Sequence, residues 1–259
     1  MKPCGGSASV LELAPHLAYN FFDKPCLPFF RGRVMILARL IRVCASALLC
    51  AGVSLFPGNA SADGAGTVVD GRAILKMSKG SNLCALTFDD GPSSHTERLM
   101  EILRERGIHA TFFVVGKQVK YHPELIVRLQ QEGHEIGNHT YSHQKGWGMS
   151  LERYTEDVDF ANDLIHSELF RPPYARITPA QARFLGQRYK LVMWDIISRD
   201  YNRRLSPRTC LKNVTKYLAP GAIVVFHDSE KAFRNMRYAL PRTLEKIRQM
   251  GLKCKAIEL

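Results

Sequence analysis

CALTFDDGP, residues 84–92, joins a short apolar run to two carboxylates and a turn. A run of this length that ends in a turn signal is typical of a buried strand, and Gly91–Pro92 supplies the turn. A helix is expected at 96–106, with its apolar residues on one face and Gly107 as its stop, and ATFFVV (110–115) predicts a second strand. This order of strand, helix and strand indicates a parallel sheet with helical crossovers.

The same alternation continues along the chain without an internal repeat or a low-complexity segment. Helices are expected at 123–133, 150–165, 178–186, from 206 onward and at 238–250, and strands at 134–138, 169–173, 190–194, 222–226 and 253–259. Right-handed crossovers would curl such a sheet toward a barrel, but about 200 residues are fewer than the ~250 of a complete eight-fold barrel. We therefore expect an α/β fold, a distorted, incompletely closed (β/α) barrel of seven to eight strands.

The first 62 residues precede this alternation and have the pattern of an export signal. An apolar run at 43–56 follows four arginines and precedes two small residues, namely Arg31, Arg33, Arg39, Arg42, Ala60 and Ala62. This order predicts a signal peptide within 1–62 and an exported mature domain at 63–259, in the periplasm, the cell envelope or the medium. An uncleaved anchor that associates with the membrane is the alternative, although the run is shorter than the ~20 residues that span a bilayer. Met35 is an alternative start of translation.

The formal charge is +12, and it falls to +8 without residues 1–62, which leaves 30 Lys and Arg against 22 Asp and Glu. A basic domain suits an anionic surface or polymer, and equally a solvated surface that aids solubility. The basic residues are spread along the chain without a binding motif of aromatic and basic residues. We therefore expect no nucleic-acid partner.

Three cysteines remain after residue 62, namely Cys84, Cys210 and Cys254. An odd number argues against a complete disulfide framework. Buried thiols are therefore expected, with a bridge between Cys84 and Cys254 as the alternative.

Asp89 and Asp90 follow the first strand directly. Catalytic groups of parallel barrels lie at the carboxyl ends of the strands, and a turn there lets two adjacent carboxylates reach one cavity. Alone, this pair is equally typical of an acidic turn before a helix. The residues that follow the later strands decide between the two interpretations.

GNHTYSH (137–143) places His139 and His143 four residues apart, directly after a strand. On a helical turn this spacing would put both imidazoles on one face, where two ring nitrogens can bind one metal ion. Two histidines and one carboxylate leave positions open for water and substrate, as a catalytic metal site requires. These ligands favour Zn²⁺, although Co²⁺, Mn²⁺ or Ni²⁺ would also fit.

The strand AIVVF (222–226) ends in His227 and Asp228. A histidine at that position can act as a general acid if its pKa is held near neutral. By itself it would be more typical of a hydrogen-bonded histidine at a strand end. Polar groups at three strand ends on the same side of the sheet indicate one catalytic centre.

Together, TFDDGP, HTYSH, RPPYA (171–175) and His227 resemble the motifs of the polysaccharide deacetylase family, also known as the NodB homology domain or carbohydrate esterase family 4. The resemblance covers residues 83–259 with the motifs in the family's order, and TFDDGP with HTYSH is its most specific part. It implies a distorted barrel with a metal at its mouth, and a hydrolase that removes acetyl groups from carbohydrate polymers.

The resemblance also implies a role for each motif residue. The metal ligands would be Asp90, His139 and His143. The catalytic residues would be the general base Asp89, its partner Arg171, the general acid His227 and its partner Asp200. The substrate would be contacted by Pro173 and by Tyr174, whose backbone N–H would stabilise the oxyanion.

Two residues that would form the pocket wall depart from the family's pattern. Tyr201 follows Asp200 where tryptophan is usual, and Val225 lies two residues before His227 where leucine is usual. The expected reaction is the removal of N-acetyl groups from N-acetylglucosamine units of peptidoglycan or chitooligosaccharide. The alternatives are an O-acetyl esterase acting on xylan, a small-amide hydrolase, and a non-catalytic carbohydrate-binding protein. The oligomeric state is not predicted.

Overall fold

The computed structural model describes residues 73–74 and 82–257, which all belong to one unit, Pro57–Leu259. The signal peptide or anchor expected within 1–62 and the alternative start at Met35 lie outside the described residues and stay predictions. No helix in the described part of the chain is both long enough and apolar enough to cross a membrane.

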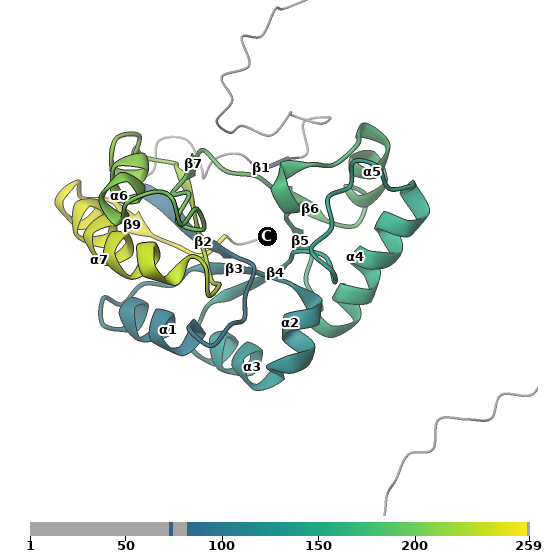
Figure 1. Cartoon of the computed structure of the whole chain (residues 1–259), viewed down its shortest axis with the longest axis horizontal. Helices are drawn as coiled ribbons and strands as arrows, with labels where there is room; N and C mark the ends of the chain where they lie inside the picture. The colour runs from purple at the N-terminus through teal and green to yellow at the C-terminus, as the bar shows by residue number, and fades with distance from the viewer. Residues whose placement is uncertain (1–72, 75–81, 258–259) are drawn as a thin grey trace, which may run out of the picture. The chain divides into compact units, whose positions relative to one another are not determined.

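The described strands form one parallel sheet that curves around a central space (Figure 1). Its order is β1 (Ala73–Ile74), β6 (Lys190–Val192), β5 (Leu169–Phe170), β4 (Glu135–Asn138), β3 (Thr111–Val114), β2 (Leu83–Asp89), β8 (Ile223–His227) and β7 (Ile196–Ile197), with β9 (Lys253–Cys254) beside β2. Within 73–74 and 82–257, no pairing joins β7 to β1. The prediction of a parallel, incompletely closed barrel is therefore confirmed.

The sheet has nine strands rather than the expected seven to eight. The strands that the sequence did not predict are β1 and β7, each of two residues. Two residues carry no alternating pattern, so these strands form only because a neighbouring strand pairs with them. The final strand is also shorter than expected: it pairs only at Lys253–Cys254, and the Ile257 N–H then donates to the Thr111 hydroxyl at 2.8 Å.

The helices of the described residues lie along the outer side of the sheet (Figure 1). They are α1 (Thr96–Arg104), α2 (Gly116–Tyr121), α3 (Pro123–Gln131), α4 (Leu151–Ile165), α5 (Pro179–Leu185), α6 (Pro207–Thr215) and α7 (Phe233–Gln249). Ser150, Thr178 and Ser206 cap three of them by accepting a backbone N–H three residues further on.

Two helices differ from the prediction. The sequence did not predict α2, and α7 begins at Phe233 rather than at residue 238. Pro241 lies inside α7, where it removes a hydrogen bond and ordinarily breaks a helix. The helix nevertheless continues through it, because Met236 and Leu240 belong to the same buried face.

Side chains alternate across the sheet and so separate the core from the barrel interior. Phe88 packs in the core between the sheet and the helices, whereas Ala85 faces the interior together with Phe113 and Ile257. The inward residues of β2 are therefore 85, 87 and 89. This alternation carries Asp89 into the interior at the carboxyl end of the strand.

Candidate active site and metal centre

The end of β2 sends its two carboxylates in different directions. Asp89 is the last strand residue and is only 4% exposed. Asp90 follows with φ of 82°, a left-handed conformation that is uncommon for a residue other than glycine. The predicted turn therefore already begins at Asp90, and it separates the two adjacent side chains.

Asp90, His139 and His143 come together, with one ligand atom of each within 4.8 Å of the others. Nδ1 of His139 lies 2.7 Å from the Arg171 carbonyl oxygen, so this nitrogen carries the hydrogen and Nε2 keeps its lone pair. Burial lowers the pKa of His139 to about 4, which leaves the ring neutral. Nε2 of His143 lies 3.2 Å from an Asp90 carboxylate oxygen.

The ionisation of Asp90 suits a metal ligand. Burial opposes its charge, but the hydrogen bond with His143 and the nearby His227 outweigh burial and hold the pKa of Asp90 well below its ordinary value. A carboxylate and two imidazoles are the donors of a catalytic divalent-metal site. The structure thus brings together the three ligands that the resemblance implies.

The chain between the two histidines is not the helical turn that their spacing suggests. Only Tyr141 and Ser142 form a bend, and the residues on either side of it, Thr140 and His143, are left-handed with φ of 64° and 56°. Asn138 fixes the conformation at Thr140, because its side chain accepts the Thr140 N–H at 2.8 Å and donates to the Val158 carbonyl at 2.9 Å. The two rings still meet, with centroids 5.1 Å apart.

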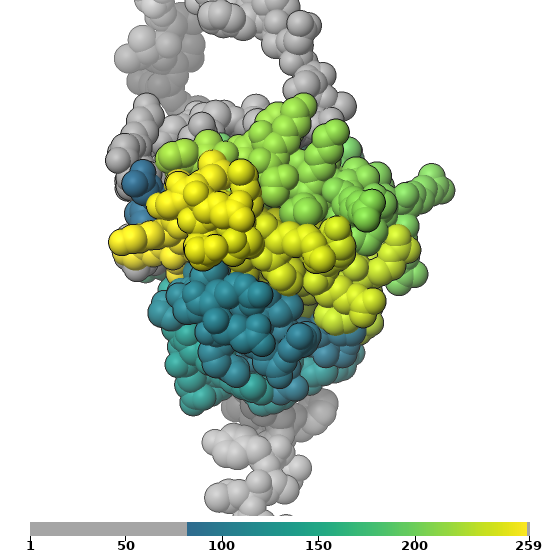
Figure 2. Space-filling model, turned by 90° about the vertical axis from the view of Figure 1, so that its left-hand side faces the viewer, coloured from purple at the N-terminus to yellow at the C-terminus, as the bar shows by residue number. Residues whose placement is uncertain are grey.

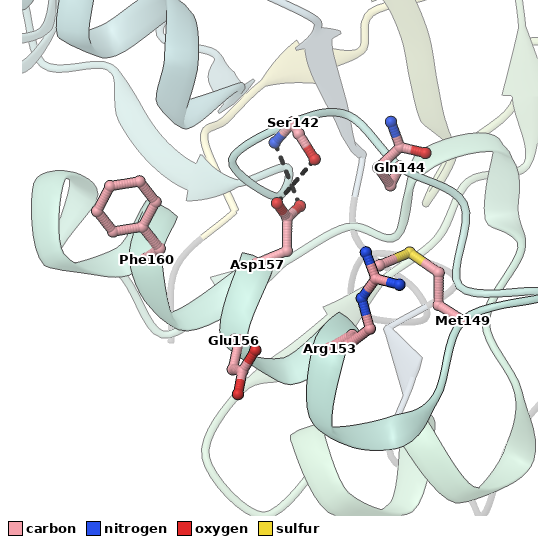
Figure 3. Close-up of a pocket in the computed structure, with 7 residues that line it drawn as sticks. All are labelled: Ser142, Gln144, Met149, Arg153, Glu156, Asp157 and Phe160. Atoms are coloured by element: carbon pink, nitrogen blue, oxygen red, sulfur yellow. Dashed lines mark hydrogen bonds between the residues drawn. The ribbon is translucent and has the colours of Figure 1, made fainter.

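Helix α4 anchors the loop beside His143 (Figure 3). The Asp157 carboxylate accepts hydrogen bonds from the Ser142 N–H at 3.2 Å and from the Ser142 hydroxyl at 2.7 Å, and its carbonyl accepts the Tyr141 N–H at 3.1 Å. Asp157 and Ser142 both line an open cavity of about 670 Å³. Sequence reasoning missed Asp157, because only the fold brings it to a loop 15 residues earlier.

Asp89 forms an ion pair with Arg171 in the barrel interior. Nη1 of Arg171 donates to Asp89 at 2.7 Å and to the Thr87 hydroxyl at 2.7 Å. The rest of the guanidinium donates to two backbone carbonyls, and its centre lies 4.1 Å from the centroid of the Phe113 ring. Burial lowers the pKa of Arg171, while the charge of Asp89 opposes this effect. The Asp89 carboxylate is therefore held in one orientation.

His227 forms a second buried pair, with Asp200. Nδ1 of His227 lies 2.8 Å from one Asp200 oxygen, and the His227 backbone N–H donates to the other at 3.0 Å. Burial disfavours the charged ring, but the charge and hydrogen bond of Asp200 outweigh it and raise the pKa of His227 to about 9. The ring therefore carries a proton at neutral pH.

The RPPYA motif forms a tight turn beside His143. Tyr174 has φ of 59°, its side chain is 62% exposed, and its hydroxyl lies 3.2 Å from Nδ1 of His143. Pro173 is buried below it. The Ala175 and Arg176 N–H groups donate within the turn, whereas in the described residues the Tyr174 N–H has no backbone acceptor. That N–H is available to a ligand.

Tyr201 and Val225, the two departures from the family's pattern, both lie beside His227. The Tyr201 ring is 4.7 Å from the His227 ring, and the residue is 38% exposed. Val225 is fully buried one inward position below His227 on β8. Tyr201 can therefore contact a ligand, whereas Val225 is buried below His227.

Asp228, which the sequence places directly after His227, has a role that sequence reasoning did not assign. Its carboxylate accepts hydrogen bonds from the Ser93 hydroxyl at 2.6 Å and the Thr96 hydroxyl at 2.5 Å, although burial raises its pKa. A Cβ at Gly91 would collide with this carboxylate. Asp228 thus fixes the loop that carries Asp90, and its place directly after His227 was the available signal.

Comparisons with known proteins identify the family of this chain. Residues 76–190 match the family model described as polysaccharide deacetylase. A peptidoglycan-N-acetylglucosamine deacetylase of Bacillus cereus is 30% identical over 192 residues, which are 71% of this chain and 90% of the relative. The chain belongs to the polysaccharide deacetylase family. The predicted resemblance to this family is confirmed.

Other members of the polysaccharide deacetylase family differ in length from this chain. The peptidoglycan-N-acetylmuramic acid deacetylase PdaC of Bacillus subtilis is 30% identical over 174 residues, which are 64% of this chain but only 36% of the relative. The crystal structure of a peptidoglycan N-acetylglucosamine deacetylase, bound to an N-oxidanyl-benzamide, matches with a TM-score of 0.67 at 26% identity. It covers 72% of this chain and 91% of that chain. The family's barrel is therefore shared across most of the described residues.

Proposed function

We propose that this chain is an exported, metal-dependent hydrolase that removes N-acetyl groups from N-acetylglucosamine units of a polysaccharide. The observation that supports the proposal is the position of two buried ion pairs, one with the proposed base (Asp89–Arg171) and one with the proposed acid (His227–Asp200). Both lie beside the cluster of Asp90, His139 and His143. Amide hydrolysis needs a base, an acid and a site that stabilises negative charge, and these groups supply all three.

The donor set fits a divalent metal, since Asp90 is ionised and His139 is neutral with Nε2 available. Asp90, His139 and His143 would hold the ion, with Zn²⁺ as the favoured metal and Co²⁺, Mn²⁺ or Ni²⁺ as alternatives. When bound, the ion would act as a Lewis acid toward the acetyl carbonyl and make water a better nucleophile.

The remaining steps belong to the chain's own residues. Asp89 accepts the proton of the attacking water, and the hydrogen bond from Arg171 holds its carboxylate in one orientation. The Tyr174 N–H donates to the oxygen that gains negative charge. His227 carries its proton at neutral pH and transfers it to the departing nitrogen, while Asp200 holds the ring in place.

Acetate release tests this proposal. The full chain should release acetate from N-acetylchitooligosaccharide or from peptidoglycan, and a chelator should abolish the release. Release that a chelator does not affect would contradict the metal-dependent mechanism. Bound metal without any release of acetate would favour a different substrate, and neither metal nor release would favour a non-catalytic carbohydrate-binding protein.

The second candidate function is the hydrolysis of an ester or a small amide, and Tyr201 is the residue that favours it. It is partly exposed beside the proposed acid, at a position where the family's pattern has tryptophan. The same residues would also hydrolyse an acetyl ester, whose leaving group needs less help from an acid. Faster release from acetylated xylan than from chitooligosaccharide would favour the esterase.

A further inference from the structure

Charge is distributed unevenly along the chain. Residues 83–198 contain 13 Lys and Arg against 15 Asp and Glu, whereas residues 199–259 contain 14 against 5. Two of those five acidic residues, Asp200 and Asp228, are buried in the site. The second part includes α6 and α7, which lie side by side on the face shown in light green and yellow in Figure 2. The exposed surface of this part is therefore strongly cationic.

Four exposed cations of this part lie where α7 begins and in the loop before α6. We call them the cationic rim: Arg203, Arg204, Lys231 and Arg234. Within residues 82–257, none of the four forms an ion pair. Glu230, the acidic neighbour of Lys231 in sequence, lines the same cavity as Arg203 and Lys231. It is bound by the Ser94 hydroxyl and by His95 at 3.0 Å, which lower its pKa, and the charge of Arg203 also lowers it.

The exposed arginines of residues 83–198 are different, because carboxylates neutralise many of them. The ion pairs there include Arg98–Glu101, Arg104–Glu132, Arg128–Glu97 and Arg188–Asp159. Carboxylates therefore neutralise several arginines of residues 83–198, whereas the described structure gives none of the four residues of the cationic rim an ion pair.

The cationic rim adjoins the metal ligands. Arg203 and Lys231 line the same cavity of about 560 Å³ as Asp90 and His143. A ligand that fills this cavity can therefore contact the metal site and the rim together.

The loop that carries Arg203 and Arg204 is attached to α7. The buried Asn235 side chain donates to the Asp200 carbonyl at 3.0 Å and to the Asn202 carbonyl at 3.3 Å, and Arg234 donates to the Leu205 carbonyl at 3.5 Å. These bonds hold the backbone of the loop in place before a ligand arrives, which lowers the part of the entropic cost of binding that comes from ordering the loop.

We propose that the cationic rim binds carboxylate groups of an anionic glycan whose acetamido group lies at the metal site. The inference rests on the proposed function and narrows its substrate class to carboxylate-bearing chains, such as peptidoglycan with its stem peptides. Guanidinium groups bind carboxylates through two parallel hydrogen bonds, and the rim offers three of them. A neutral chitooligosaccharide offers no partner to these charges. Because two rim residues line the cavity of the metal ligands, we favour the substrate over a membrane surface as the occupant.

The main test compares kcat/KM of the full chain on peptidoglycan fragments that retain their carboxylates and on the same fragments after amidation. Wild type should prefer the anionic form, and added salt should reduce the preference, because screening weakens exposed charge contacts. In Arg203→Gln/Lys231→Gln, the ratio of the two kcat/KM values should fall about tenfold or more, mainly through KM. An unchanged ratio would overturn the proposal.

Two further variants separate charge from structure. Arg203→Lys/Lys231→Arg keeps both charges and should restore most of the preference, whereas an equal loss on both substrates would show that the residues only shape the loop. Arg242→Gln/Lys246→Gln removes two exposed charges from the C-terminal half of α7 and should leave the ratio unchanged. A similar fall in this control would indicate a general charge effect and overturn the assignment to the rim.

A binding assay keeps the test independent of catalysis. The full chain should co-sediment with intact peptidoglycan more than with amidated peptidoglycan, and Arg203→Gln/Lys231→Gln should lose that difference. If wild type releases no acetate from any substrate, the proposed function fails, and this difference in sedimentation still decides whether the rim binds anionic glycan. Binding to phosphatidylglycerol vesicles that depends on the rim, without a preference for anionic peptidoglycan, would overturn the proposal in favour of a membrane surface.

Discussion

The site contains two contacts between an acidic and a basic side chain, one buried in the barrel interior and one partly exposed in the loops. Asp89–Arg171 lies in the barrel interior, where the two side chains are 6% and 0% exposed, whereas Asp90 and His143 are 14% and 26% exposed in the loops above it. Arg171 is surrounded by strand carbonyls and aromatic rings, but His143 depends on a bent loop. The interior pair should therefore affect both folding and catalysis, whereas changes around His143 should affect metal binding and leave the fold intact.

The largest effect is expected from Asp89→Asn, which keeps the size of the side chain and removes the base. General bases typically contribute ~10²–10⁴-fold to the rate, so kcat should fall by about that factor while bound metal is retained. Acetate release and elemental analysis measure the two quantities. A rate close to that of wild type would contradict the assignment of Asp89.

Arg171→Met tests how much the Asp89–Arg171 ion pair contributes to the stability of the fold. Removing one partner leaves Asp89 buried without a counter-charge, which costs about 3–5 kcal/mol in the free energy of unfolding. Urea denaturation gives this value. Arg188→Met, which breaks the exposed pair with Asp159, is the control and should cost under ~1 kcal/mol. Equal costs in the two variants would show that the interior setting does not matter.

Asp157→Ala tests the loop of His143. It removes the acceptor that holds Ser142, so metal affinity should fall about 10–100-fold while the midpoint of thermal unfolding without metal changes little. His139→Ala, which removes a ligand itself, should leave almost no metal in elemental analysis. Glu156→Gln, a change at a neighbouring position of the same cavity, is the control. Unchanged metal affinity in Asp157→Ala would contradict a positioning role.

The smallest effect concerns His134, which lies away from both pairs and accepts the Ala110 N–H through Nδ1 at 3.2 Å. Burial lowers its pKa to about 4, whereas in the unfolded chain it has the ordinary value of about 6.5. Between these values the unfolded state binds more protons, so this contribution to stability is complete above pH ~6.5 and is lost as the pH falls toward about 4.

His134→Gln keeps an acceptor and removes this titration. The free energy of unfolding of the variant should therefore decrease less between pH 6.5 and pH 4.5 than that of wild type. Urea denaturation at several pH values measures the slope. Identical slopes would show that another group causes the acid sensitivity.

The sequence predicted the parts of the fold that local patterns encode. The buried strands at β2, β3, β4 and β8 and the capped helices at Ser150 and Ser206 follow from apolar runs and caps. The two-residue strands and the continuation of α7 through Pro241 depend on tertiary pairing and packing, which no local pattern contains.

The candidate site divides in the same way. Asp90, His139 and His143 lie in recognisable motifs, and the structure brings them together. The left-handed conformations of Thr140 and His143 could not be predicted, because they depend on Asn138 and on α4. Asp157 was missed and Asp228 was given no role, because the partners of both residues lie on other elements.

The central claim is that one divalent metal, held by Asp90, His139 and His143, is required for acetate release. The most direct test strips the full chain with a chelator and then titrates Zn²⁺ back while acetate release from N-acetylated glycan is followed. The account predicts no release from the stripped protein and a recovery that saturates at one ion per chain. Full release from protein that contains no metal by elemental analysis would contradict it.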